Sequence, residues 1–147
     1  MNVLVVSGCL GDKPYDGPSI GCAEIDSSSR EELLRRYPDR TASAREMYTG
    51  QEHGVVTPAV ENLREYADVT WKIVFAGYGL LDETDEIVAY ECSFTVIGPV
   101  RKRARKWGYE QNKLKQDETC QVVARKKDIP SELRRTTESG YEIVFTQ

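Results

Sequence analysis

Val3-Leu4-Val5-Val6 is a continuous apolar run, and it ends in the turn Ser7-Gly8-Cys9. A short run without polar alternation predicts a strand buried on both faces, as in the middle of a parallel sheet. Residues 69–76 predict a second strand beside the first, since their apolar side chains alternate until Gly77. Ligands of open α/β sheets bind at the carboxyl ends of strands, so we expect any site on the loops that follow these two strands.

Helical patterns separate these strands from each other and from a last predicted strand at residues 141–146. Capping boxes at residues 29–32 and 43–46 predict two short helices, and Thr57-Pro58 predicts the start of a third. Residues 8–29 have the composition of a long loop, residues 88–96 alternate like an extended segment, and residues 118–124 fit either a helix or a strand. Pro99 opens a basic helix, and residues 131–139 form another.

The order of these segments predicts an α/β fold: a single domain over residues 1–147 with a mostly parallel central sheet and helices on both faces. Because the chain stops inside a strand, we expect either a truncated C-terminus or a strand at the edge of the sheet.

The composition is that of a globular protein, with 39% hydrophobic and 30% charged residues. The apolar N-terminal run is too short for a membrane span and lacks the basic region of a signal peptide, so we expect a cytoplasmic protein without a membrane partner. The four cysteines form no C-x-x-C pair, which predicts reduced thiols, and with His53 as the sole histidine we expect no metal site and no cofactor.

The formal charge is unevenly distributed along the chain. The net charge is −4, but residues 101–115 carry +6 and the remaining 132 residues carry −10. The basic residues of the predicted helix are Arg101, Lys102, Arg103, Arg105 and Lys106. They predict a nucleic-acid contact in which Trp107 and Tyr109 stack on bases. The alternative is an amphipathic helix that docks on the sheet through Val100, Ala104 and Trp107 and leaves its charges in solvent.

The turn after the first strand contains Ser7, Cys9 and Lys13. Its glycines would let backbone N–H groups approach an anion, with Lys13 adding a positive charge. A flexible turn without a ligand is the equally open alternative. Cys9 is a candidate ligand-binding residue, although the sequence assigns no base to activate its thiol.

The turn after the second strand is Gly77-Tyr78-Gly79. It predicts a presented tyrosine hydroxyl, with Tyr90 nearby and with Glu86 or Glu91 as general acid or base. The alternatives are a hairpin in which Tyr78 is a packing residue and a solvated acidic run at residues 82–86.

A third segment, residues 45–53, gathers Arg45, Tyr48, Thr49, Gly50 and His53. A guanidinium, a phenol, a hydroxyl and an imidazole at such density suit recognition of a phosphate or a nucleobase.

The motifs at residues 44–50 (ARxMYTG), 75–81 (FAGYGLL) and 89–94 (AYExxF), in this order after the first strand, resemble the YaaA-like superfamily. The resemblance covers about residues 3–94 and implies an α/β domain whose site is built from these motifs. It also implies an association with DNA and with oxidative stress, as for the peroxide-stress proteins of that superfamily. The positions that it carries over are Ser7, Tyr48, Thr49, Gly50, Gly77, Tyr78, Gly79 and Tyr90.

Three function hypotheses follow. The first is a nucleic-acid-associated, YaaA-like protein that binds or acts on DNA, RNA or a nucleotide-like ligand. The second is an enzyme that processes nucleotides or nucleosides, for example at a glycosidic bond, with Tyr78 as orienting residue. The third is an interaction module without chemistry.

Overall fold

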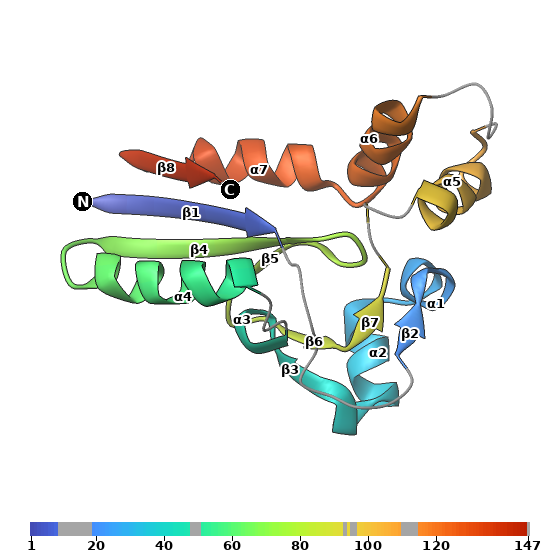
Figure 1. The fold of residues 1–147 in the computed structure, drawn as a ribbon, viewed down its shortest axis with the longest axis horizontal. Helices are drawn as coiled ribbons and strands as arrows, with labels where there is room; N and C mark the ends of the chain where they lie inside the picture. The colour runs from blue at the N-terminus through green and yellow to red at the C-terminus, as the bar shows by residue number, and fades with distance from the viewer. Residues whose placement is uncertain (9–18, 48–50, 93, 95–96, 110–114, 147) are drawn as a thin grey trace.

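A four-stranded sheet forms one end of the molecule, with β1 and β4 as its inner strands (Figure 1). The computed structural model describes residues 1–8, 19–47, 51–92, 94, 97–109 and 115–146. The strands are β1 (Asn2–Gly8), β4 (Asp68–Phe75), β5 (Gly79–Asp82) and β8 (Ile143–Thr146), in the order β5-β4-β1-β8. β1 is parallel to β4 and β8, which confirms the predicted pairing of the first two strands. The sheet is mixed rather than purely parallel, because β5 folds back antiparallel on β4.

Two small sheets lie beside this one. β2 (Ile20–Gly21) pairs in parallel with β7 (Tyr90–Glu91), and β3 (Thr41–Ser43) pairs antiparallel with β6 (Glu86–Val88). The extended segment expected at residues 88–96 is therefore wrong in its extent. Its first part is divided between two short strands with different partners.

Seven α-helices and one 3-10 helix complete the described residues. They are α1 (Cys22–Ser27), α2 (Arg30–Arg36), η1 (Pro38–Arg40), α3 (Ala44–Met47), α4 (Gln51–Arg64), α5 (Ile97–Lys106), α6 (Gln116–Lys126) and α7 (Ile129–Thr137). The predicted cap of α2 is confirmed, since the Ser29 hydroxyl accepts a hydrogen bond from the Glu32 N–H at 3.2 Å. Helix α1 lies inside the stretch expected to be a loop.

The expected helix start at Thr57 is wrong, because α4 begins at Gln51 and contains Pro58. Proline has no N–H to donate to the carbonyl of residue 54. Both Gly54 and Pro58 are exposed, so water can satisfy that carbonyl and the helix continues.

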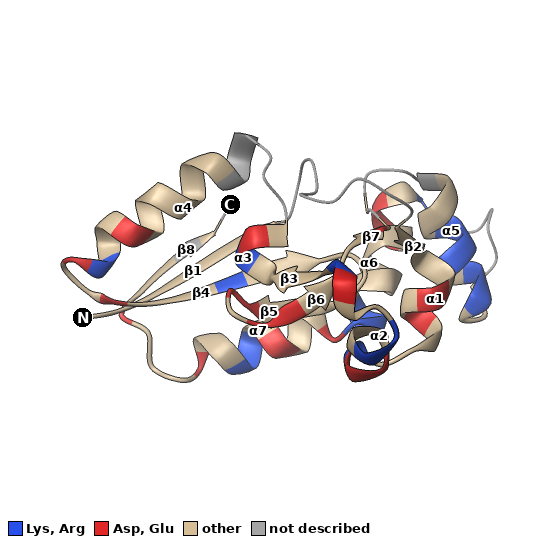
Figure 2. Ribbon diagram, turned by 90° about the horizontal axis from the view of Figure 1, so that it is seen from below, with Lys and Arg blue, Asp and Glu red and all other residues tan. Residues whose placement is uncertain are grey.

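Helices cover both faces of the central sheet. Figure 2 shows α4 on one side of the sheet and α7 on the other. Within the described residues, no helix combines the length and the apolar character needed to span a bilayer.

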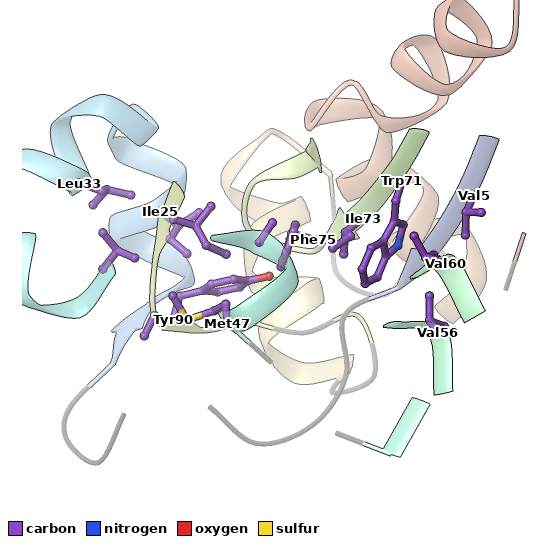
Figure 3. Packing of buried hydrophobic residues seen from close by; sticks show 14 of the residues in the cluster. Val5, Ile25, Leu33, Met47, Val56, Val60, Trp71, Ile73, Phe75 and Tyr90 are labelled. Atoms are coloured by element: carbon purple, nitrogen blue, oxygen red, sulfur yellow. The ribbon is translucent and has the colours of Figure 1, made fainter. Parts of the chain in front are cut away.

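One buried cluster connects the central sheet to the smaller sheets. Figure 3 shows Trp71, Ile73 and Phe75 of β4 between Val60 of α4 and Tyr90 of β7. All five side chains are buried. The alternation seen in the sequence of β4 thus places one face of this strand in the centre of the core.

A disulfide joins Cys22 to Cys92, so the expectation of four reduced thiols is wrong for this pair. The two residues are 70 positions apart in the chain, but parallel pairing of β2 with β7 matches Ile20 to Tyr90 and Gly21 to Glu91. The next step of this register places Cys22 opposite Cys92, with their Cα atoms 5.0 Å apart. Cys120 is a free thiol, and Cys9 lies outside the described residues.

Candidate functional site

The end of β1 places Ser7 in the core. The Ser7 hydroxyl accepts a hydrogen bond from the indole N–H of Trp71 at 2.8 Å, and Ser7 is buried. This bond links the carboxyl end of β1 to the middle of β4. Cys9 and Lys13, the other candidates of this turn, lie outside the described residues.

The turn after β4 is the hairpin that the sequence left as an alternative, since Phe75 pairs with Gly79 across it. The Tyr78 hydroxyl donates to the Val88 carbonyl at 3.0 Å and accepts from the Val88 N–H at 3.2 Å. Burial raises the pKa of Tyr78 to about 12. At neutral pH this side chain is a protonated phenol that binds β6.

Each of the two glycines of this turn lies close to atoms of neighbouring elements. A Cβ at Gly77 would lie 2.8 Å from side-chain atoms of both Ile25 and Tyr90. Gly79 has a φ of +85°, and a Cβ there would lie 2.7 Å from the carbonyl oxygen of Lys127. Glycine is therefore needed at both positions for packing.

Tyr90 is buried next to this turn. Its ring meets that of Tyr78 edge-to-face with centroids 5.2 Å apart, and its hydroxyl accepts a hydrogen bond from the Gly77 N–H at 3.4 Å. Gly77, Tyr78, Gly79 and Tyr90 thus form one packed group around the hairpin.

The two candidate acid–base carboxylates occupy exposed positions. Glu86 is the first residue of β6, and its backbone carbonyl accepts a hydrogen bond from Arg30. Glu91 is the second residue of β7. Among the described residues, the partners of the Tyr78 hydroxyl are both backbone groups of Val88, so neither carboxylate is joined to it.

Arg45 belongs to an ion-pair cluster on the α4 side of the molecule, which we call the four-residue cluster: Arg45, Glu61, Arg64 and Glu83. Arg45 binds Glu61 at 2.7 Å and Glu83 at 3.0 Å, and Arg64 binds the same two carboxylates. The Arg45 guanidinium also lies over the Trp71 ring, 5.7 Å from its centroid. Tyr48, Thr49 and Gly50 lie outside the described residues, as does the side chain of His53.

The cluster corrects one expectation about the acidic run at residues 82–86. Glu83 is 9% exposed, so it is not part of a solvated face. The hydrogen bond from Arg45 is the main reason that the pKa of Glu61 lies below its ordinary value.

Helix α5 has two faces of different character. Val100, Arg103 and Ala104 are buried on one face, as the docking alternative expected for Val100 and Ala104, but the helix packs on α6 and α1 rather than on the central sheet. Lys102, Arg105 and Lys106 are exposed, and their spacing of three and four residues places them on one face. Among the described residues, no ion pair involves these three cations.

A Schellman motif ends α5. The Tyr109 N–H donates to the Ala104 carbonyl at 3.1 Å, the Gly108 N–H donates to the Arg105 carbonyl at 3.0 Å, and Gly108 has a φ of +91°. Tyr109 is 39% exposed directly after this turn. An aromatic ring therefore follows the cationic face at a fixed position.

Arg103 and Arg101 differ from these exposed cations. Arg103 and Asp26 are each 3% exposed and form a bidentate pair, with Nε at 2.7 Å and Nη2 at 2.8 Å from the two carboxylate oxygens. Lys127 binds the same carboxylate at 2.7 Å. We call Asp26, Arg103 and Lys127 the three-residue cluster. The Arg101 Nε is buried without a hydrogen-bond partner among the described residues.

The charge state of Asp26 follows from these contacts. Burial alone would raise its pKa, but the hydrogen bonds from Arg103 and Lys127 outweigh burial and hold the pKa below the ordinary value of 3.8. Asp26 is therefore ionised at neutral pH and carries one negative charge against two positive ones.

A pocket of about 520 Å³ lies at the amino ends of β1 and β4, opposite the carboxyl ends where the sequence predicted a site. Asn2, Asp68 and Tyr141 line it, at the amino ends of β1 and β4 and just before β8. None of the site residues predicted from the sequence lines this pocket. In the part of the chain that is described, no group of three or more His, Cys, Asp or Glu side chains is placed to hold a metal ion.

Local sequence patterns do not identify Trp71, Asp26, Glu83 or Lys127 as partners of the candidate residues. Trp71 contacts both Ser7 and Arg45, although its alternation in β4 indicated only a core residue. Asp26 is 77 positions from Arg103, and nothing in either local pattern indicates the pairing.

Comparison of the chain with protein-family models, with curated proteins and with solved structures finds no match.

Proposed function

We propose that this chain is a nucleic-acid-binding protein that contacts the phosphate backbone of a single strand through the exposed face of α5. The observation that carries the proposal is the separation of cations on this helix. Arg103 is neutralised in the interior, whereas Lys102, Arg105 and Lys106 share one exposed face of a helix that contains no acid. Figure 2 shows α5, with its Lys and Arg residues in blue, at the end of the molecule opposite the N-terminus.

The net charge of the chain favours a local contact. A protein with a charge of −4 repels a polyanion over most of its surface, so binding needs a patch of the opposite sign. Lys and Arg side chains on such a patch displace the counterions condensed on phosphates, which makes the affinity depend on salt.

Tyr109 favours a single strand over a duplex. An exposed aromatic ring stacks on an unpaired base regardless of base identity, and such stacking adds about 1–3 kcal/mol per base. Tyr109 is exposed at the turn that ends α5, after Trp107 and Gly108. The assignment to the YaaA-like superfamily and a cytoplasmic location remain predictions from the sequence, and both are compatible with this proposal.

The catalytic alternative has less support. It needs Tyr78 as an orienting residue, and the hydroxyl of Tyr78 is engaged by the backbone of Val88. Stabilisation of the protein by a mononucleotide, lost in Tyr78→Phe, would favour that alternative over ours.

The test is a salt titration of binding. Fluorescence anisotropy with a labelled single strand of about 20 nucleotides, as DNA and as RNA, measures the affinity of the wild type and of the Lys102→Ala/Arg105→Ala/Lys106→Ala variant. Loss of three phosphate contacts should make the slope of log K against log salt shallower by about 2, since each contact contributes about 0.7 for a single strand.

The matched control removes the same charge elsewhere. Arg35, Arg134 and Arg135 are exposed cations of α2 and α7, and their triple alanine variant should keep the wild-type slope. Arg103 is left unchanged because it is buried on Asp26, so its loss would alter folding as well as binding. Equal slopes for the wild type and the α5 variant would disprove the proposed contact.

A further inference from the structure

The disulfide Cys22–Cys92 is a covalent link between α1 and β7. It joins the first residue of α1 to the residue after β7. The backbone pairing at this point, between β2 and β7, has only two residue pairs. Isolated pairing of this length is marginal in water, so the disulfide adds a covalent restraint to the burial of Ile25 of α1 in the cluster that contains Tyr90 of β7.

The same helix binds α5, which also packs on α6. Asp26 lies four residues after Cys22, hence one turn further along α1 on the same side. It receives the bidentate hydrogen bonds of Arg103 from α5 and the ammonium group of Lys127 from the end of α6. The disulfide at Cys22 and the ion pair of Asp26 with α5 are therefore one turn apart on α1.

The buried Arg103 of α5 depends on this carboxylate. Arg103 is 97% buried, and Asp26 is its acidic partner among the described residues, while its Nη1 has no hydrogen-bond partner there. A buried guanidinium that loses its carboxylate is strongly unfavourable, so a displacement of α1 should carry Arg103 out toward water. The exposed cations of α5 would then lose their fixed arrangement.

We propose that the Cys22–Cys92 disulfide is a redox-controlled clamp on α5, and that its reduction loosens α1 and α5 and weakens nucleic-acid binding. In the reduction, a dithiol donates two electrons and two protons, the S–S bond breaks to give the thiols of Cys22 and Cys92, and the dithiol becomes a disulfide. Both cysteines are partly exposed, so a small thiol reagent can reach the bond. The effect on affinity rests on the proposed function, whereas the effect on α5 does not.

The experiment compares the oxidised protein with the protein reduced by dithiothreitol. Hydrogen exchange of the α5 amides reports the order of the helix, and anisotropy with the labelled single strand reports binding. We expect faster exchange over residues 97–106 and at least about a fivefold weaker affinity after reduction, because an ordered cationic face binds better than a mobile one. A Cys22→Ser/Cys92→Ser variant should match the reduced protein and not respond to the reagent.

Cys120→Ser is the matched control, because Cys120 is a free thiol outside the bridge, and it should keep the full response. Unchanged exchange of α5 on reduction would overturn the clamp. So would mass spectrometry showing that Cys22 and Cys92 stay unpaired after treatment with glutathione disulfide. If neither form binds nucleic acid but α5 exchange still rises on reduction, the proposed function fails while the clamp stands.

Discussion

The two ion-pair clusters of the molecule differ in burial and in charge balance. The four-residue cluster of Arg45, Glu61, Arg64 and Glu83 has two cations and two carboxylates, with side chains 11–50% exposed. The three-residue cluster of Asp26, Arg103 and Lys127 has two cations for one carboxylate, and its side chains are 3–16% exposed.

The difference in burial and charge balance predicts different responses of the two clusters to the loss of one member. A balanced, partly solvated network stays satisfied when one member is lost, because its other members re-pair or take up water. A buried carboxylate that binds two cations cannot be replaced in this way. The first cluster ties α3 and α4 to the turn after β5, whereas the second ties α5 to α1 and to the end of α6.

The largest expected effect comes from Asp26→Asn. The amide keeps the shape but removes the charge that compensates Arg103 and Lys127, and the free energy of unfolding should fall by about 3 kcal/mol. Urea denaturation measures this loss. Asp39→Asn, the same change at an exposed position, should leave the stability nearly unchanged.

The pH profile of the same pair of proteins checks the cause. Asp26 has a pKa below 3.8 in the folded protein, so its stabilising effect is present at higher pH and is lost as the pH falls below about 4. The difference in stability between the wild type and Asp26→Asn should therefore shrink in acid. A difference that is constant down to pH 3 would point to a steric effect of the substitution.

An intermediate effect is expected for Gly79→Ala. Its Cβ would collide with the carbonyl oxygen of Lys127 and its φ is positive, so β5 must move away from the segment that holds Lys127. The loss should be about 2 kcal/mol. Gly98→Ala, with open space around its Cβ, serves as the control in thermal denaturation and should not destabilise the protein. A larger cost at Gly98 would contradict this packing.

The smallest effects are expected in the four-residue cluster, where Glu83→Gln should cost more than Glu61→Gln. Two ion pairs are weakened, but Arg45 and Arg64 keep Glu61, so the loss should be about 1 kcal/mol. Glu61→Gln is more exposed and should cost less still. A loss at Glu83 as large as that at Asp26, in the same urea assay, would remove the distinction between the two clusters.

Local patterns predicted β1, β4 and β8, several helices and, as one of two alternatives, the two faces of α5. The apolar run at residues 3–6 and the alternation at residues 69–75 each fix a strand by burial alone, and the Ser29 cap fixes the start of α2. The pattern at residues 57–58 predicted a start inside α4, because a proline that suits the first turn of a helix is also tolerated where its surroundings are solvated.

Candidate residues were harder to interpret from the sequence. Tyr78 lies in a glycine turn that resembles a presented hydroxyl, yet both of its hydrogen bonds go to Val88 ten positions away. Arg103 is indistinguishable in the sequence from its basic neighbours, but it alone among Lys102, Arg103, Arg105 and Lys106 is buried. A side chain's role depends on partners that come from other elements.

The sequence alone therefore determined the α/β character, the pairing of β1 with β4 and the concentration of positive charge on α5. Each of these follows from a pattern of apolar or charged residues within one short segment. The tertiary structure alone decided that Cys22 meets Cys92, that Asp26 neutralises Arg103 and that three cations of α5 remain exposed. These contacts join residues 70 and 77 positions apart, and only the folding of the strands and helices onto each other determines which groups lose their water.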